Sequence, residues 1–394
     1  MPHSPVSETS NRNGRIFENH LPRHVIAGRG ASARLVELAA KRGWRRAFVV
    51  SDAGVSNAGL LERFVAPLEE AGLLAGSFAD VPTEPPVSVA DNIAARIADR
   101  EADVVVALGG GSVMDAVKVA SLVARHGRPA RDFVGIGKAG GRGLPTVLIP
   151  TTAGTGSEAT FVALLTDTET GNKVGVVDPC LLADCAMVDP ALTDALPPAV
   201  TAAAGMDALV HALEAFIART ATPLSHGLAL EAARHIGPAL EVVCLDPANK
   251  TARDEMAIGS HLAGMAFANS SCCAVHGLAL PLGGRFHIPH GVITGCFAGE
   301  MMRHNAPACL ELFTEFGAAL GWGALPAPAF TDRLDAVAET IGLRTLLRRT
   351  PVPAESFPAM ASNAVANRRL MDPNPRVVTE SDAVRIYQTV LGAT

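Results

Sequence analysis

The sequence predicts an α/β domain with a parallel sheet, followed by an all-helical domain. In the first half of the chain, continuous apolar runs alternate with amphipathic stretches, a pattern typical of parallel strands covered by helices on both faces. After about residue 193, strand-like runs nearly vanish, and Ala-rich and Leu-rich stretches continue to the end. The 394 residues suffice for two domains at roughly 150 residues each. We therefore expect an α/β domain over 1–193, with 1–15 as a loose polar tail, and a helical domain over 194–394.

Each strand predicted in the first domain is an apolar run that ends in turn-forming residues. The four runs are RRAFVVSDAG (45–54), ADVVVALGGGS (102–112), GLPTVLIPTTAGTGSE (143–158) and CAMVDPALT (185–193). Two stretches between them carry apolar residues at intervals of three and four, which predicts helices. These are LLERFVAPLEEAG (60–72) and SVADNIAARIADREA (88–102).

The helices predicted in the second domain are often preceded by Ser, Thr, Asp or Pro, residues that commonly open a helix. They are expected at 208–219, 224–236, 255–268, 309–321, 330–342 and 379–391.

Composition argues against two classes of partner. The chain carries 33 Lys plus Arg against 39 Asp plus Glu, a net charge of −6, and only 4% aromatic residues, so we expect no nucleic-acid partner. No run approaches the ~20 apolar residues that a membrane span needs, and the polar N-terminus lacks a signal core, so no membrane association is expected. The odd count of seven cysteines without a C-x-x-C pair predicts reduced thiols in the cytoplasm.

Adjacent Cys272 and Cys273 precede His276 by only a few residues. Thiolates bind soft metals, but free cysteines are commonly buried as small apolar groups. Apolar packing is therefore the expected role of both thiols.

A glycine-rich turn joins the second predicted strand to a helix. Gly110 and Gly111 allow backbone N–H groups to approach a ligand, and Ser112 and Asp115 stand where the helix begins. The spacing matches neither G-x-G-x-x-G nor the Walker pattern. Taken alone, the turn is as consistent with ordinary chain reversal as with a phosphate site.

A second loop follows the third predicted strand and supplies the hydroxyls of Thr151, Thr152 and Thr155. Two such loops at strand ends suggest a ligand across the carboxyl edge of the sheet, although an exposed loop with local turns fits the same residues. Asp52, at the end of the first predicted strand, suits an adenosine ribose and would repel a 2′-phosphate, which favours NAD over NADP. A lone Asp there is equally a helix cap.

Four residues of the second domain form a candidate metal site. Asp207 and His211 stand four residues apart and face the same way on one predicted helix. His276 and His290 are joined by a Pro- and Gly-containing segment, which we expect to loop back and bring both rings together. One carboxylate and three imidazoles suit Fe²⁺ or Zn²⁺, whereas each residue alone is also consistent with a structural role.

Together these residues give the chain a resemblance to the iron-containing (group III) alcohol dehydrogenases over about residues 17 to 393. The motifs that carry it are GGGSVMDAVK (109–118), PTTAGTGSE (150–158), GMDALVHALEAF (205–216), VHGLALPLGGRFHIPHG (275–291) and NPR (374–376).

The resemblance implies a Rossmann-like N-terminal domain and a helical C-terminal domain, the architecture shared with dehydroquinate synthases. It also implies that Asp207, His211, His276 and His290 bind a divalent metal, with Fe²⁺ favoured and Zn²⁺ possible. The NAD(P) contacts that it implies are Asp52, the residues from Gly111 to Asp115 and from Thr151 to Thr155, and Lys173. Relatives are commonly homodimers.

Two positions depart from the family pattern. Many relatives carry a proton-handling His where this chain has Leu280, and Asn-Pro-Thr where it has Glu84-Pro85-Pro86. We therefore considered His287, or an ordered water chain, as the proton route, against a packing or surface role for His287.

The expected function is hydride transfer between NAD(P) and a small alcohol, aldehyde or ketone whose oxygen a metal activates. The alternatives are a maleylacetate reductase or hydroxyacid dehydrogenase on the same fold, and, further off, a non-redox lyase or an inactive binder.

Overall fold

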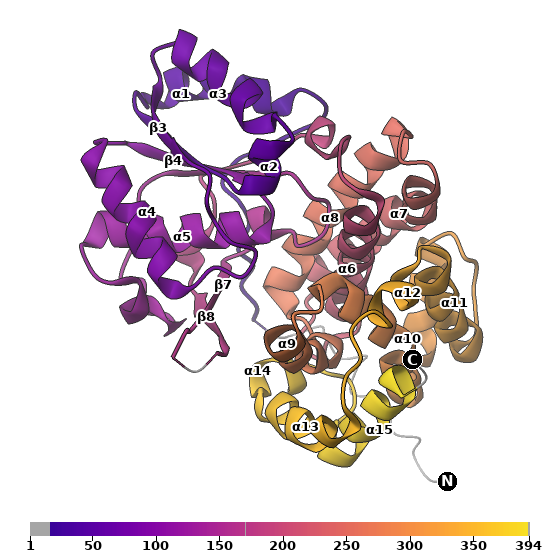
Figure 1. The fold of residues 1–394 in the computed structure, drawn as a ribbon. Coiled ribbons are helices and arrows are strands. Elements are labelled where there is room, and N and C mark those ends of the chain that lie inside the picture. Colours follow the sequence, from indigo (N-terminus) through magenta and orange to yellow (C-terminus); the bar gives the residue numbers. More distant parts are fainter. Residues whose placement is uncertain (1–15, 170, 393–394) are drawn as a thin grey trace.

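The computed structural model describes residues 16–169 and 171–392, so the tail predicted over 1–15 lies outside the described residues. Figure 1 shows a sheet-containing part built from the first half of the chain beside a helical part built from the second. The last strand of the main sheet ends at Val188 and the first helix of the second part begins at Pro198. The division predicted after residue 193 falls between them.

The main sheet has six strands in the order β1-β9-β6-β4-β2-β3, and all its strand pairs are parallel. Its strands are β1 (Val25–Ala27), β2 (Ala47–Val50), β3 (Leu74–Phe78), β4 (Val104–Gly109), β6 (Thr146–Pro150) and β9 (Cys185–Val188). The predicted strands are β2, β4, β6 and β9, which are fully buried. β1 and β3 were not predicted. Both are edge strands that are short or partly exposed, and neither contains a long apolar run.

Helices cover both faces of this sheet. They are α1 (Leu35–Arg42), α2 (Ala53–Asn57), α3 (Leu60–Glu70), α4 (Val87–Asp99) and α5 (Gly111–His126). On β4, Val105 and Ala107 pack with α4 and α5, whereas Val106 and Leu108 pack with α1 and α3 (Figure 1). A strand that is apolar at every position therefore results from burial on both of its faces.

A small second sheet was not predicted. It has the order β5-β8-β7, from β5 (Gly135–Ile136), β7 (Val162–Thr166) and β8 (Lys173–Val177). The antiparallel β7–β8 hairpin follows the Thr-rich loop, and β7 lies against α5. The hairpin carries Lys173 toward the helical part.

The second part is all helical among the described residues after Thr193. Its helices are α6 (Pro198–Ile217), α7 (Pro223–Leu245), α8 (Lys250–Ser270), α9 (Ala274–Phe286), α10 (His290–Ala319), α11 (Ala327–Thr340), α12 (Leu343–Leu347), α13 (Phe357–Ala366), α14 (Arg368–Met371) and α15 (Glu380–Leu391). α6 packs against α7, α8 and α10 and is buried around most of its circumference.

By length and composition α6 could span a bilayer, as could α8 and α9 if this bent pair formed one span. However, 83% of the apolar window of α6 is buried inside the protein, as in a core helix.

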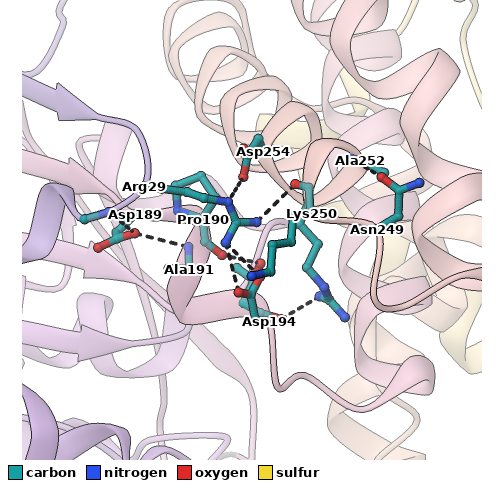
Figure 2. A network of polar contacts seen from close by, with 12 residues as sticks. Arg29, Asp189, Pro190, Ala191, Asp194, Asn249, Lys250, Ala252 and Asp254 are labelled. Carbon is teal, nitrogen blue, oxygen red and sulfur yellow. Dashed lines mark hydrogen bonds and ion pairs between the residues drawn. The ribbon is translucent and has the colours of Figure 1, made fainter.

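Arg29 joins the two parts at the loop after β1 (Figure 2). Its guanidinium lies 2.9 Å from Asp194 Oδ2 and 2.8 Å from Asp254 Oδ1, and it donates to the carbonyl of Lys250 at 3.1 Å. Arg253, next to Asp254 on α8, donates to the carbonyl of Thr193. The linker between β9 and α6, which contains Thr193 and Asp194, is therefore bound by Arg29 of the first part and by Arg253 of the second.

Candidate metal and dinucleotide site

α6 supplies the carboxylate and the first imidazole of the candidate metal site. Asp207 and His211 lie one turn apart and are only 4% and 6% exposed. Thr294 on α10 donates its hydroxyl to Asp207 Oδ1 at 2.9 Å. Burial disfavours the charge of Asp207, but His211, His290 and His276, together with this hydrogen bond, outweigh it and keep the pKa of Asp207 below its ordinary value.

His276 and His290 reach the same place by a different path from the one expected. The segment between them is mostly helix α9 rather than a loop, with Pro281 inside it. His287 ends α9 in the left-handed conformation (φ 54°), and α10 begins at His290. A helix and a sharp reversal therefore bring the rings together.

The four side chains converge. His276 Nε2 and His290 Nε2 each lie 3.8 Å from Asp207 Oδ1, and His211 Nδ1 lies 3.7 Å from Asp207 Oδ2. The ring of His211 stacks on that of His276, with centroids 4.5 Å apart. The two Nε2 separations from Asp207 Oδ1 are too long for hydrogen bonds but suit ligands of one ion, each about 2 Å from it. His211 Nδ1 faces the Gly154 carbonyl at 3.2 Å, so Nε2 is the nitrogen of His211 that would bind an ion.

One buried nitrogen, Nε2 of His276, indicates that these residues can bind a cation. This atom is buried and has no hydrogen-bond partner, which is costly for an isolated polar atom. One donor atom each of Asp207, His276 and His290 lies within 4.8 Å of the others. Burial, together with the charges of His276 and His290 and against that of Asp207, lowers the pKa of His211 to about 3. His211 is therefore neutral near pH 7, as a metal ligand must be. At His276 the effect of burial is outweighed by Cys272 and Glu214, which raise its pKa. The convergence of the donor atoms and the unpartnered Nε2 of His276 are the observations that fit a divalent ion.

The glycine-rich turn and the Thr-rich loop meet at the carboxyl ends of β4 and β6. A Cβ on Gly111 would lie 3.0 Å from Thr155 Cγ2, and a Cβ on Gly110 would lie 3.6 Å from Thr152 Oγ1. These glycines therefore permit the close approach of the two loops. Thr151, the residue after β6, is buried, and its N–H donates to the Gly109 carbonyl.

The polar residues near this edge already have protein partners. Asp52 Oδ1 caps α2 by accepting from Val55 N at 2.9 Å. Ser112 donates to the carbonyl of Thr83. Asp115 accepts from Ser157 Oγ at 2.6 Å and from Leu164 N at 2.9 Å, which ties α5 to the Thr-rich loop. Contacts of these three residues with a cofactor stay predictions.

The Thr-rich loop also contacts the candidate metal ligands directly. The carbonyl of Gly154 lies 3.2 Å from His211 Nδ1, and a Cβ on Gly154 would be only 2.8 Å from Ala204 of α6. The predicted cofactor loop and the predicted metal ligands are thus neighbours.

Lys173 and His287 meet across Glu84. Lys173 Nζ lies 3.4 Å from Glu84 Oε1, and His287 Nδ1 lies 3.8 Å from Glu84 Oε2. Local desolvation is the main cause that lowers the pKa of His290, and the Lys173 ammonium contributes to the decrease. The side chain of His287 is 78% exposed. Its role in proton transfer stays a prediction.

Comparison with known proteins decides the family. The family model described as iron-containing alcohol dehydrogenase matches residues 22–190, and the model of the C-terminal region of the same family matches 201–391. The chain belongs to the iron-containing alcohol dehydrogenase family.

Several members of the iron-containing alcohol dehydrogenase family resemble the chain over nearly its full length. Long-chain-alcohol dehydrogenase 1 of Geobacillus thermodenitrificans (strain NG80-2) is 35% identical, over 93% of this chain and 95% of the relative. Lactaldehyde reductase of Escherichia coli (strain K12) is 32% identical, over 92% and 96%.

Solved structures of related enzymes have the same fold as this chain. A 1,3-propanediol oxidoreductase has a TM-score of 0.88 at 31% identity, over 95% of this chain and all of that one. Sulfoacetaldehyde reductase from Bifidobacterium kashiwanohense in complex with NAD+ has a TM-score of 0.88 at 28% identity, over 97% of this chain and all of that one. The predicted family and fold are confirmed, and the chain is an NAD-dependent oxidoreductase of the iron type.

Glu214 lies in the candidate site and was not predicted from the sequence. It is fully buried on α6, and its Oε2 lies 2.5 Å from His276 Nδ1. Its two oxygens also accept from Cys273 N at 2.9 Å and Val275 N at 2.7 Å. A carboxylate that holds Nδ1–H leaves Nε2 free for a metal. The available signal was spacing, because Glu214 follows Asp207 by two helical turns.

Proposed function

We propose that Asp207, His211, His276 and His290 hold a ferrous ion and that this centre serves the oxidation of a small alcohol, or the reverse reduction, with NAD. The observation that carries the proposal is the buried, unpartnered Nε2 of His276 facing Asp207, next to His290. When bound, the ion would act as a Lewis acid on the substrate oxygen while the nicotinamide exchanges the hydride.

The residues of the chain would prepare this centre. Asp207 supplies a fixed negative charge, and Glu214 orients His276. Three of the four proposed ligands are almost fully buried, whereas the side chain of His290 is 43% exposed. Substrate would therefore reach the centre from the His290 side, where Lys173 also lies.

The proposed substrates are uncharged alcohols and aldehydes. Leu280 stands one helical turn after His276 on α9, where it makes the wall more apolar than a His would. Relatives include a long-chain-alcohol dehydrogenase and a lactaldehyde reductase, which supports an alcohol/aldehyde class.

The test follows NADH absorbance in anaerobic, iron-loaded protein with alcohols of increasing chain length, lactaldehyde and sulfoacetaldehyde, using NAD and NADP in parallel. We expect turnover with NAD that a chelator abolishes and that Asp207→Asn lowers by about a hundredfold to a thousandfold, since a neutral amide oxygen replaces the charged carboxylate ligand. Chelator-resistant turnover, or an unaffected Asp207→Asn variant, would overturn the assigned centre.

His287 is proposed to carry the proton in place of the His that Leu280 replaces. His287 lies three residues before His290 and beside Glu84, which supports a path from this side of the centre to solvent. If His287→Ala left the pH–rate profile unchanged, a water chain would take the role instead.

We also propose a cytoplasmic homodimer without nucleic-acid or membrane partners. The free state of all seven cysteines supports a reducing compartment, and the family resemblance supports the dimer. Light scattering of purified protein tests the assembly, and a monomeric mass would overturn it.

A further inference from the structure

A cysteine lies beside the proposed ligands. Cys272 belongs to the short connection between α8 and α9, four residues before His276, and is 8% exposed. One donor atom each of His211, Cys272 and His276 lies within 4.8 Å of the others. Two of these residues also belong to the proposed iron quartet.

The connection that carries Cys272 has an unusual backbone conformation. Ser271 has φ 130° and ψ 160°, a region that is essentially restricted to glycine and costs about 1–3 kcal/mol for other residues. The adjacent Cys273 is fixed differently, since its N–H donates to Glu214 and its Sγ lies 3.7 Å from the Glu214 carbonyl oxygen. The two neighbouring thiols therefore have distinct surroundings.

We propose that Cys272 is an additional ligand of the metal centre. Together with His211 and His276 it would give the centre a second, softer donor set, one thiolate and two imidazoles, for thiophilic divalent ions such as Zn²⁺ or Cd²⁺. The buried Nε2 of His276, which no protein group satisfies, is the second observation behind this set. Asp207, His276 and His290 offer oxygen and nitrogen to an iron-like ion, whereas thiolate selects softer ions. On binding, the thiol releases its proton to solvent.

This inference rests on the proposed function, because His211 and His276 are shared. It goes further in assigning a sulfur donor and hence a preference for another class of ion. It also replaces the expectation of purely apolar packing for Cys272, while that expectation still suits Cys273.

Cobalt substitution tests the proposal without relying on activity. The full-length protein is stripped of metal and loaded anaerobically with one equivalent of Co²⁺, and its absorption spectrum is recorded. We expect visible d–d bands together with a near-ultraviolet thiolate-to-cobalt charge-transfer band. Cys272→Ser and Cys272→Ala should lose only the near-ultraviolet band, and Cys273→Ala, the matched control, should keep both.

Competition between ions gives a second readout. Replacing Cys272 with Ser should weaken Cd²⁺ binding roughly tenfold or more relative to Mn²⁺, since even outer-shell changes commonly cost 10–100-fold in metal affinity. An unchanged Cd²⁺/Mn²⁺ ratio would overturn the proposal.

The outcomes separate the two claims. d–d bands without the charge-transfer band, or a charge-transfer band that survives in both Cys272 variants, would overturn the cysteine ligand and leave the iron centre standing. Absence of d–d bands in the unmutated protein would overturn the metal centre and the cysteine ligand together.

Discussion

Asp207 and Glu214 are two buried carboxylates on the same face of α6, and their surroundings give them different tasks. Asp207 faces three imidazoles and accepts one hydroxyl, which leaves it able to bind a cation. Glu214 accepts two backbone N–H groups and the Nδ1–H of His276, so its hydrogen-bonding capacity is used within the protein. One helix thus supplies both a proposed ligand and the residue that orients another proposed ligand.

Glu214→Gln should reduce metal affinity by about 10–100-fold, because the amide cannot hold His276 as strongly as a carboxylate does. Metal titration of the stripped protein measures the change, and turnover should recover in part at saturating metal. Glu241→Gln, which alters an ion pair with Arg333, is the control. Equal metal affinities of the Glu214→Gln and Glu241→Gln variants would contradict the orienting role of Glu214.

Cys185 on β9 should make stability depend on alkaline pH. Burial raises the pKa of its thiol from 9.0 to about 11. Between these values the unfolded chain loses the thiol proton first, so the free energy of unfolding should fall as pH rises, by at most about 1.4 kcal/mol per unit.

Urea unfolding from pH 7 to 11 measures this effect. Cys185→Ala should show a shallower decline above pH 9 than the unmodified protein. The two curves should run parallel near pH 7, about two units below the ordinary pKa of 9.0, where the thiol is protonated in both states. Parallel curves above pH 9 as well would contradict the assignment.

At the scale of elements, the contact between the Thr-rich loop and α8 positions the proposed cofactor site. Gly156 has φ +58°, and a Cβ on it would lie 2.6 Å from the Cα of Gly264 on α8. Glu158 in the same loop pairs with His261 of α8 at 2.9 Å, and both are buried. The loop is therefore held by the helical part as well as by β6.

Gly156→Ala should lower the free energy of unfolding by about 1–3 kcal/mol more than Gly127→Ala and should raise KM for NAD. Gly127 has a similar φ of +65° but open space around it, so it reports the cost of backbone strain alone, about 1 kcal/mol. Denaturant unfolding and steady-state kinetics provide the comparison. Similar decreases in the free energy of unfolding of both variants would show that the close approach to Gly264 does not affect stability.

At the scale of the whole molecule, the site depends on two parts being held together. The carbonyl of Gly154 contacts His211, and Lys173 contacts Glu84 and helps to lower the pKa of His290, so the proposed cofactor and metal residues share one boundary. The Arg29 network fixes the linker at this boundary (Figure 2).

Arg29→Ala should reduce the free energy of unfolding by about 1–2 kcal/mol, because several partly buried partners lose their donor at once. Arg34→Ala, which removes one exposed pair with Glu37, should change it by less than about 0.5 kcal/mol. Thermal and urea unfolding at low and high salt measure both variants. The difference between the two variants should narrow as salt rises, and equal effects at low salt would contradict the proposed junction.

The sequence by itself determined the layout of the fold and the chemistry of the proposed ligands. β2, β4, β6 and β9 were predictable because strands buried on both faces are apolar at every position. The i, i+4 spacing of Asp207 and His211 likewise fixed their common direction on α6.

Tertiary structure decided the remainder, because it depends on contacts between residues distant in sequence. The edge strand β3 and the β7–β8 hairpin are only partly buried and lack long apolar runs, so local pattern did not distinguish them. α9 replaced the expected loop, and its direction alone places His276 against Glu214 and near Cys272. Spacing along a chain states which side chains can share a helix face, but only packing fixes which helices bring those faces to one point.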